Sequence, residues 1–147
     1  MIIRELGAEE VALLVKIDIS VNPSAWSIEN YLDAINNENQ YILGIFNESD
    51  ILLGGITYSS VLDEAEILQV CISAKEQRNG YASQLFSHLF DTLINSGVTQ
   101  IFLEVRSNNT PAINLYHKLG FNIIAERKNY YRINGKLFDA LVMAKSI

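Results

Sequence analysis

The sequence predicts an α/β (α+β) fold in which a mixed, mostly antiparallel sheet of about seven strands carries helices on both faces. Hairpin signals at Asn47–Asp50 and Asn134-Gly135 each separate two strand-like segments. Between them, an amphipathic helical segment lies between two apolar strand-like segments, which is typical of a parallel crossover. Because 49% of the residues are hydrophobic and 19% are charged, the composition is globular. We expect a single domain over residues 1–147.

The first part of the chain predicts one strand and two helices. Ile2–Glu5 is expected to be an edge strand, and Glu9–Ile19 a helix that Asn22-Pro23 ends. Ser27 is suited to cap a second helix that runs to about Ile35. One side of the first helix carries Val11 and Leu14, with Asp18 near them.

Three further strands are expected to form an antiparallel meander. They are Tyr41–Phe46, Ile51–Ser60 and Glu66–Ile72. The crossover helix follows at Gly80–Asn95, and Gly97 is suited to the position just after it. Gln100–Val105 then becomes the parallel neighbour of Glu66–Ile72. In such sheets, ligands bind beyond the carboxyl ends of the parallel strands.

The end of the chain predicts a short helix and a hairpin. The helix is Pro111–Leu119, because proline suits the first helical turn and Gly120 ends the helix. The hairpin joins Ile123–Arg132 to Leu137–Ala144 through Asn134-Gly135, a dipeptide that favours a type I′ turn.

Gln77–Ala82, which leads into the crossover helix, is the most informative segment. At a helix N-terminus the first amide groups lack partners within the helix and the helix dipole is positive, so backbone alone holds an anion. Gly80 lets a phosphate approach closely, and Ala82 is small enough to allow the same. The segment therefore indicates a cofactor with a pyrophosphate. An ordinary loop whose glycine permits a turn explains these residues alone equally well.

The same segment resembles the Q/R-x-x-G-x-G/A acetyl-coenzyme A motif of the GNAT N-acetyltransferases. Further matches to that family's core are Leu103–Arg106, Ser107–Asn109, Ala112–Tyr116 and Leu119–Phe121. Together with Asn129–Tyr131, they resemble the ribosomal-protein-alanine N-acetyltransferases within the family. The resemblance implies a GNAT-like sheet whose parallel strand pair is splayed at the cofactor site. It also implies acetyl transfer from acetyl-CoA to the N-terminal alanine of a small-subunit ribosomal protein.

Two catalytic residues follow from the resemblance. Glu104, at the carboxyl end of its strand, matches the general base, acting directly or through a water. From the residues alone, a salt bridge to Arg106 or another cation explains this carboxylate better. Tyr116 matches the general acid that protonates the coenzyme A thiolate, a role that suits a phenol with a pKa near 10. In isolation, Tyr116 could equally be a packed core residue.

The resemblance also implies the cofactor-binding residues. The backbone of one strand end would hold the pantetheine and polarise the thioester; its residues are Val70, Cys71 and Ile72. The pyrophosphate loop comprises Arg78, Asn79, Gly80, Tyr81, Ala82 and Ser83. Asn109 matches an asparagine that touches the cofactor, although a capping or turn role explains it equally well. We assign the Cys71 side chain to packing rather than to nucleophilic catalysis, because no partner constellation accompanies it.

Three aromatic residues resemble positions on the peptide-binding side, namely Trp26, Tyr130 and Tyr131. Core packing explains them about as well. The sequence departs from the expected pattern in the last hairpin, where Phe138 stands in place of an acidic residue before Asp139. The peptide groove is therefore expected to differ from that of the resembled enzymes.

Composition narrows the partners. A net charge of −6 argues against direct nucleic-acid binding and favours a basic acceptor peptide. The acidic segment Asp63–Glu66 agrees with this, although a solvated turn explains it better. His88 and His117 lack zinc-ligand spacing, so no metal is expected. No apolar run is long enough for a membrane span, and we expect a cytoplasmic enzyme that is a monomer or weak dimer.

Two other functions use the same cofactor core. One is a GNAT enzyme that acetylates another protein N-terminus, a lysine or a small amine. The other is a module that binds coenzyme A without catalysis, which the presence of both Glu104 and Tyr116 argues against. The fold by itself does not select among these functions.

Overall fold

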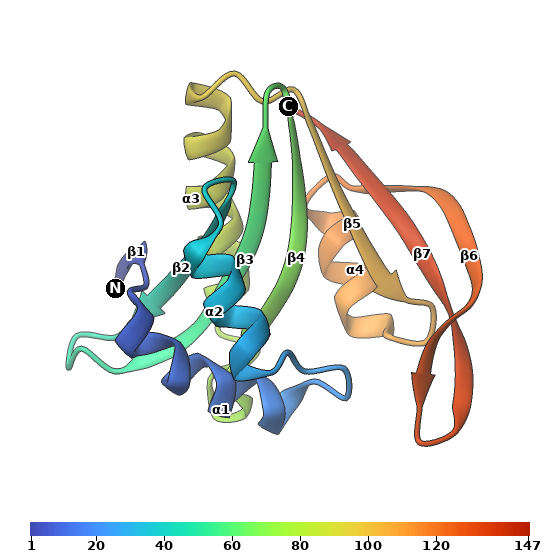
Figure 1. Cartoon of the computed structure of the whole chain (residues 1–147). Helices are drawn as coiled ribbons and strands as arrows, with labels where there is room; N and C mark the ends of the chain where they lie inside the picture. The colour runs from blue at the N-terminus through green and yellow to red at the C-terminus, as the bar shows by residue number, and fades with distance from the viewer.

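The computed structural model describes residues 1–147 and contains one seven-stranded sheet in the order β1-β2-β3-β4-β5-β7-β6 (Figure 1). The strands are β1 (Ile2–Glu5), β2 (Gln40–Phe46), β3 (Leu52–Val61), β4 (Glu64–Ile72), β5 (Gln100–Arg106), β6 (Asn122–Ile133) and β7 (Lys136–Ser146). The helices are α1 (Val11–Val21), α2 (Ile28–Asn36), α3 (Tyr81–Asn95) and α4 (Thr110–Lys118), with short 3-10 turns η1 (Ala8–Glu10) and η2 (Ala74–Glu76).

All neighbouring strands are antiparallel except β4 and β5, which are joined by α3 and run parallel. The predicted mixed sheet, its meander and its single parallel crossover are therefore confirmed. The predicted type I′ hairpin is also confirmed, because Asn134 and Gly135 have φ angles of 51° and 78° and Ile133 pairs with Lys136. No helix of the chain combines the length and the apolar character that crossing a bilayer requires.

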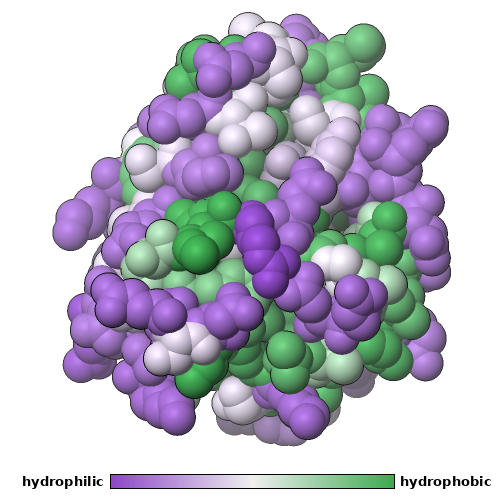
Figure 2. All heavy atoms as spheres, turned by 90° about the vertical axis from the view of Figure 1, so that its left-hand side faces the viewer, coloured by the Kyte–Doolittle hydropathy of each residue, from purple (hydrophilic) through white to green (hydrophobic).

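Helices cover both faces of the sheet, as predicted. Figure 1 shows α1 and α2 on one face and α3 on the other. Residues of α3 and α4 pack into the larger core, which includes Phe86, Tyr116 and Phe121. Residues of α1 and α2 form the second core, which includes Leu14 and Tyr31. On the side of the molecule seen in Figure 2, hydrophilic residues surround separate apolar patches.

The helix ends differ slightly from their predicted positions. The first helical segment begins as η1, where Glu10 accepts from the Gly7 N–H at 3.0 Å, and α1 continues to Val21 before Pro23. The C-terminus of α3 lies where it was predicted: Gly97 has a φ of 89°, and the Val98 N–H donates to the Leu93 carbonyl.

A bulge in β4 separates the two parallel strands. Tyr58 of β3 pairs with Ile67 and Thr57 pairs with Gln69, so Leu68 has no partner. Pairing between β4 and β5 ends at Ile67 and Leu103, immediately before this bulge. A bulge bends its strand and increases the local twist. Beyond it, β4 and β5 diverge and leave an opening at their carboxyl ends, as the splayed pair was predicted to do.

Candidate active site

A cleft of about 920 Å³ occupies the opening between β4 and β5. Its walls come from the ends of both strands, the start of α3, the helix α4, the loop after α1 and part of β6. It contains fourteen of the fifteen predicted site residues: Trp26, Val70, Cys71, Ile72, Arg78, Gly80, Tyr81, Ala82, Ser83, Glu104, Asn109, Tyr116, Tyr130 and Tyr131. Segments far apart in the sequence thus form one site.

The exception is Asn79, which does not line the cleft. Its side-chain amide donates to the Glu76 carbonyl at 3.2 Å and so stabilises the loop before α3. The role of Asn79 as a cofactor-binding residue stays a prediction, and the contact that its side chain makes in this structure is with the loop itself.

The N-terminus of α3 has the form of an anion cradle. Gly80 caps the helix with a φ of 79°, and a Cβ built there would have no atom within 4 Å. The open space lies beside the start of α3, where the first amide groups have no carbonyl partner within the helix. Arg78, exposed and also at a positive φ of 67°, adds a cation at the entrance. These residues fit a pyrophosphate.

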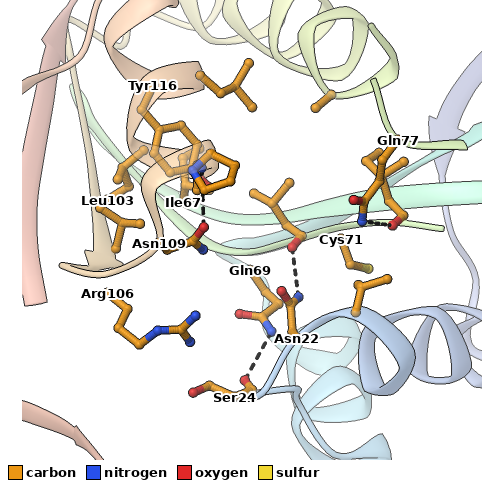
Figure 3. Close-up of a pocket in the computed structure, with 18 of the residues that line it drawn as sticks. Asn22, Ser24, Ile67, Gln69, Cys71, Gln77, Leu103, Arg106, Asn109 and Tyr116 are labelled. Atoms are coloured by element: carbon orange, nitrogen blue, oxygen red, sulfur yellow. Dashed lines mark hydrogen bonds between the residues drawn. The ribbon is translucent and has the colours of Figure 1, made fainter. Parts of the chain in front are cut away.

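The edge of β4 presents backbone groups to the cleft. Along a strand, the backbone N–H and C=O groups of successive residues point alternately to the two neighbouring strands. The Ser73 N–H donates to the Leu53 carbonyl, so the backbone groups of Ser73 and Cys71 point toward β3. Those of Val70 and Ile72 therefore point into the opening. The side chains of Asn22 and Gln77 donate to the carbonyls of Val70 and Ile72, each at 3.0 Å, which leaves the two N–H groups facing the cleft (Figure 3).

The Cys71 side chain packs in the core beneath α1 and α2. Burial raises the pKa of its thiol to about 12, and the nearby Asp18 carboxylate raises it further. Such a thiol remains protonated at neutral pH and is a poor nucleophile, in agreement with a packing role.

Glu104 lies on the cleft side of β5, where burial alternates along the strand. Its Oε1 is 3.3 Å from Nε of Arg127, and the Glu104 side chain keeps only 19% of its surface exposed. The ion pair considered from the sequence thus exists, but with Arg127; Arg106 instead donates to Asn108. Burial raises the pKa of Glu66, and the Glu104 charge raises it further while Arg127 opposes this, so these three charged groups lie close together. Glu66 and Glu104 line the cleft.

Tyr116 projects from α4 and packs against Phe86 and Phe121 with edge-to-face geometry. Burial, together with the neighbouring Tyr131, raises the pKa of its phenol to about 12. Its hydroxyl makes no hydrogen bond within the chain, yet it is not among the fully buried atoms that lack a partner, and Tyr116 lines the cleft. The ring of Tyr116 thus packs in the core, while its hydroxyl is available as a proton donor.

Tyr130 and Tyr131 lie at an irregularity in the pairing of β6 with β7. Arg127 pairs with Ala140 and Tyr131 with Phe138, so three residues of β6 face only Asp139. Asp139 accepts from the Asn129 N–H at 2.9 Å and fixes this bulge. Tyr130 is 51% exposed, which excludes a core role for it.

Asn109 is the N-cap of α4, and its Oδ1 accepts from the Ala112 N–H. The capping role considered from the sequence therefore exists. The Asn109 amide nitrogen remains available to a ligand at the rim of the cleft (Figure 3). No three His, Cys, Asp or Glu side chains gather in a way that could hold a metal ion.

The sequence did not predict the contacts of several polar residues that shape the site: Asn22, Gln69, Gln77 and Arg127. Each acts on a partner distant in sequence or, for Gln77, on a strand end whose direction the sequence does not reveal. The available signal was Asp18 on the apolar side of its helix, because a buried carboxylate requires donors from nearby segments.

A splayed parallel pair, an anion cradle at the helix that follows, and a carboxylate and a phenol that line the same cleft form the arrangement that a coenzyme A-dependent acyltransferase requires. Residues 11–121 match the Acetyltransferase (GNAT) family. The chain is 34% identical over 134 residues to the [ribosomal protein bS18]-alanine N-acetyltransferase of Salmonella typhimurium, covering 85% of this chain and 90% of that protein.

Solved structures agree. The ribosomal-protein-S18-alanine N-acetyltransferase from Escherichia coli superposes with a TM-score of 0.92 at 29% identity, covering 99% of this chain and 93% of that one. NAA60 of Arabidopsis thaliana in complex with acetyl-CoA has the same fold, with a TM-score of 0.87, 19% identity and coverage of 99% and 98%. The chain belongs to the acetyltransferase (GNAT) family and is an acetyl-CoA-dependent N-acetyltransferase. The predicted family, enzyme class and cofactor are confirmed.

Proposed function

We propose that this enzyme acetylates the α-amine of the N-terminal alanine of a small-subunit ribosomal protein. The observation that carries the proposal is that Glu104 and the Tyr116 hydroxyl line the same cleft as the α3 cradle and the free edge of β4. The names of the relatives from Salmonella typhimurium and Escherichia coli support alanine of a ribosomal protein as the acceptor.

Acetyl-CoA would supply a thioester activated toward attack by an amine. The α3 N-terminus and Arg78 are suited to its pyrophosphate, and the N–H groups of Val70 and Ile72 are suited to its pantetheine and thioester carbonyl. Asn109 offers one more donor at the rim.

Glu104 is our proposed general base, directly or through a water. A free α-amine has a pKa of about 7.7 to 8.0, so at pH 7 roughly a tenth is already neutral, compared with about one part in 2,500 for lysine. The base therefore has to remove only the proton that the amine releases on attack. The contact with Arg127 positions the carboxylate for this role.

Tyr116 is our proposed general acid. A phenol with a pKa of about 12 remains protonated across the neutral range. Its hydroxyl has no competing acceptor within the chain, so it is free to donate to the departing sulfur.

The proposed acceptor is a basic peptide. Glu66 and Glu104 lie close enough to influence one another, and the chain carries a net charge of −6. Lysines and arginines downstream of the alanine would be attracted to this side of the cleft. We retain the predictions of a cytoplasmic location, no direct nucleic-acid contact and a monomeric or weakly dimeric state.

The test is mass-spectrometric detection of acetyl transfer from acetyl-CoA to four acceptors. They are a basic peptide that begins with alanine, its N-terminally blocked form, a peptide with one lysine and a small polyamine. We expect acetylation of the free alanine terminus alone. Transfer to lysine or polyamine would show that the enzyme has a different acceptor from the one proposed. Binding of acetyl-CoA without transfer to any acceptor would indicate a module that binds coenzyme A without catalysis.

A further inference from the structure

The buried carboxylate of Asp18 holds together the segments that form one wall of the cleft. Asp18 is 0% exposed and has no cationic partner within salt-bridge distance. Its oxygens accept instead from four neutral donors: the Asn22 amide, the Trp26 N–H, the Tyr31 hydroxyl and the Gln69 amide. Because a buried carboxylate is stabilised only by such donors, their orientations are fixed.

This fixes which way the Gln69 amide points. Its nitrogen donates to both oxygens of Asp18, at 3.1 and 3.0 Å, and to the Ser24 carbonyl at 3.3 Å. If the amide were reversed, its oxygen would lie against the Asp18 carboxylate and the Ser24 carbonyl, which are both acceptors. The Gln69 Oε1 must therefore face away from Asp18 and Ser24.

The Gln69 oxygen is left without a donor. No hydrogen bond of the chain ends on it, and it is not among the buried atoms that lack a partner, so it is open to the cleft that Gln69 lines. In Figure 3 it points toward the open side of the pocket, away from Asn22 and Ser24.

We propose that the Gln69 Oε1 accepts a hydrogen bond from the first peptide N–H of the acceptor, the amide that follows the acetylated residue. This inference rests on the proposed function. Gln69 directly precedes Val70, whose N–H faces the opening where transfer would occur. One residue along a strand is about 3.3 Å, and the three bonds between an α-amine and the next amide nitrogen span about 3 Å.

The consequence is selection of peptide termini by their backbone. A polyamine, or the ammonium of a lysine side chain, has no amide N–H at this distance from the reacting nitrogen. When such an acceptor binds and excludes water from the cleft, the Gln69 oxygen would have no hydrogen-bond donor. Leaving a desolvated acceptor unpaired costs free energy. Asp18 is then a positioning residue that acts through Gln69.

The test compares two acceptors with two enzymes. The acceptors are an alanine-starting basic peptide and the same peptide methylated on its first amide nitrogen. The enzymes are the wild type and Gln69→Leu, with Gln84→Leu as the matched control, because Gln84 is exposed and does not line the cleft. The methylated peptide probes the contact in the unaltered protein, so the test does not depend on the stability of a variant.

We expect methylation to lower kcat/KM about tenfold with the wild type and with Gln84→Leu, as the loss of one hydrogen bond would. With Gln69→Leu, the unmethylated peptide should lose a similar factor and methylation should have little further effect. Equal methylation penalties with wild type and Gln69→Leu would overturn the inference while leaving the proposed function intact. No transfer to the unmethylated peptide by the wild type would overturn both.

Discussion

The Tyr31 hydroxyl donates to the Asp18 carboxylate at 2.6 Å, and both side chains are almost completely buried, with 1% and 0% of their surface exposed. Burial raises the pKa of Tyr31, and Cys71 and Asp18 raise it further, so its proton remains on the phenol. Trp26 packs on the Tyr31 ring with 5.2 Å between centroids. One bond therefore couples the core under α1 and α2 to an aromatic residue of the cleft.

Replacing Tyr31 with phenylalanine should lower the free energy of unfolding by about 1.5 to 3 kcal/mol, because a buried carboxylate loses one donor. Urea denaturation measures this change. The matched control is Tyr41→Phe, whose hydroxyl makes only a 3.4 Å contact with the Glu38 carbonyl. A loss as large in the control as in Tyr31→Phe would show that the bond to Asp18 has no special weight.

Glu104→Gln should lower kcat about 10²- to 10⁴-fold, the range expected when a general base is removed. Binding of acetyl-CoA should be nearly unchanged, because Glu104 lies on β5 and the cradle lies at the start of α3. Steady-state kinetics and calorimetry separate the two effects. Glu66→Gln removes a neighbouring charge and should change mainly the KM of the peptide; equal loss of kcat in both variants would contradict the base assignment.

Tyr116→Phe should lower kcat while leaving the fold intact, because its ring packs in the core and its hydroxyl does not. The phenol must be protonated to act, and with a pKa of about 12 it loses only about 1% of its protons by pH 10. The pH–rate profile of the wild type should therefore show no decline from Tyr116 between pH 7 and 10. A decline near pH 8 to 9 that disappears in Tyr116→Phe would contradict this.

The sequence predicted the layers of the fold but not the details that open the site. Alternating and helical patterns are local, so the order of strands and helices could be derived. The bulge at Leu68 depends on how β3 pairs with β4, which no local pattern reveals. The turn at Leu62-Asp63 lies where it was expected, but β4 begins at Glu64 rather than Glu66, because Val61 already pairs with Glu64 across a tight turn in which Leu62 adopts a φ of 56°.

The candidate site divides in the same way. Gly80 and Glu104 lie in motifs that the chain carries in one piece, and the structure places both in the cleft. Arg127 and Gln69 contact partners from other elements, and their roles follow from the packing of the folded chain. Candidate residues for the chemistry could be proposed from the sequence, whereas the residues that contact and orient them needed the structure.

The free energy of unfolding should decrease in acid because of Glu10. The hydrogen bonds from Arg4 and from the Gly7 N–H lower its pKa to about 2. The folded state therefore gains stability above about pH 4.5, and this gain is lost as the pH falls toward 2. Because the pair is partly exposed, we expect less than about 1 kcal/mol at pH 7. Urea denaturation should show that Glu10→Gln is less stable than the wild type at pH 7 and nearly equal near pH 2; a difference that grows in acid would contradict the assignment.

Gly80→Leu should greatly weaken acetyl-CoA binding, because the new side chain would occupy the open space beside the first amides of α3. Gly97 provides a matched control at the other end of the same helix: its φ is 89°, and a Cβ there also meets nothing within 4 Å. A leucine at either position carries the same left-handed backbone penalty of about 1 to 2 kcal/mol.

Thermal unfolding should therefore show similar losses for Gly80→Leu and Gly97→Leu. Calorimetry should show that only Gly80→Leu loses affinity for acetyl-CoA, by about 100-fold or more, since a displaced pyrophosphate forfeits several charge-assisted hydrogen bonds. Normal affinity in Gly80→Leu would refute the cradle. Equal loss in both variants would show that backbone strain in α3, rather than occupation of the cradle, controls binding.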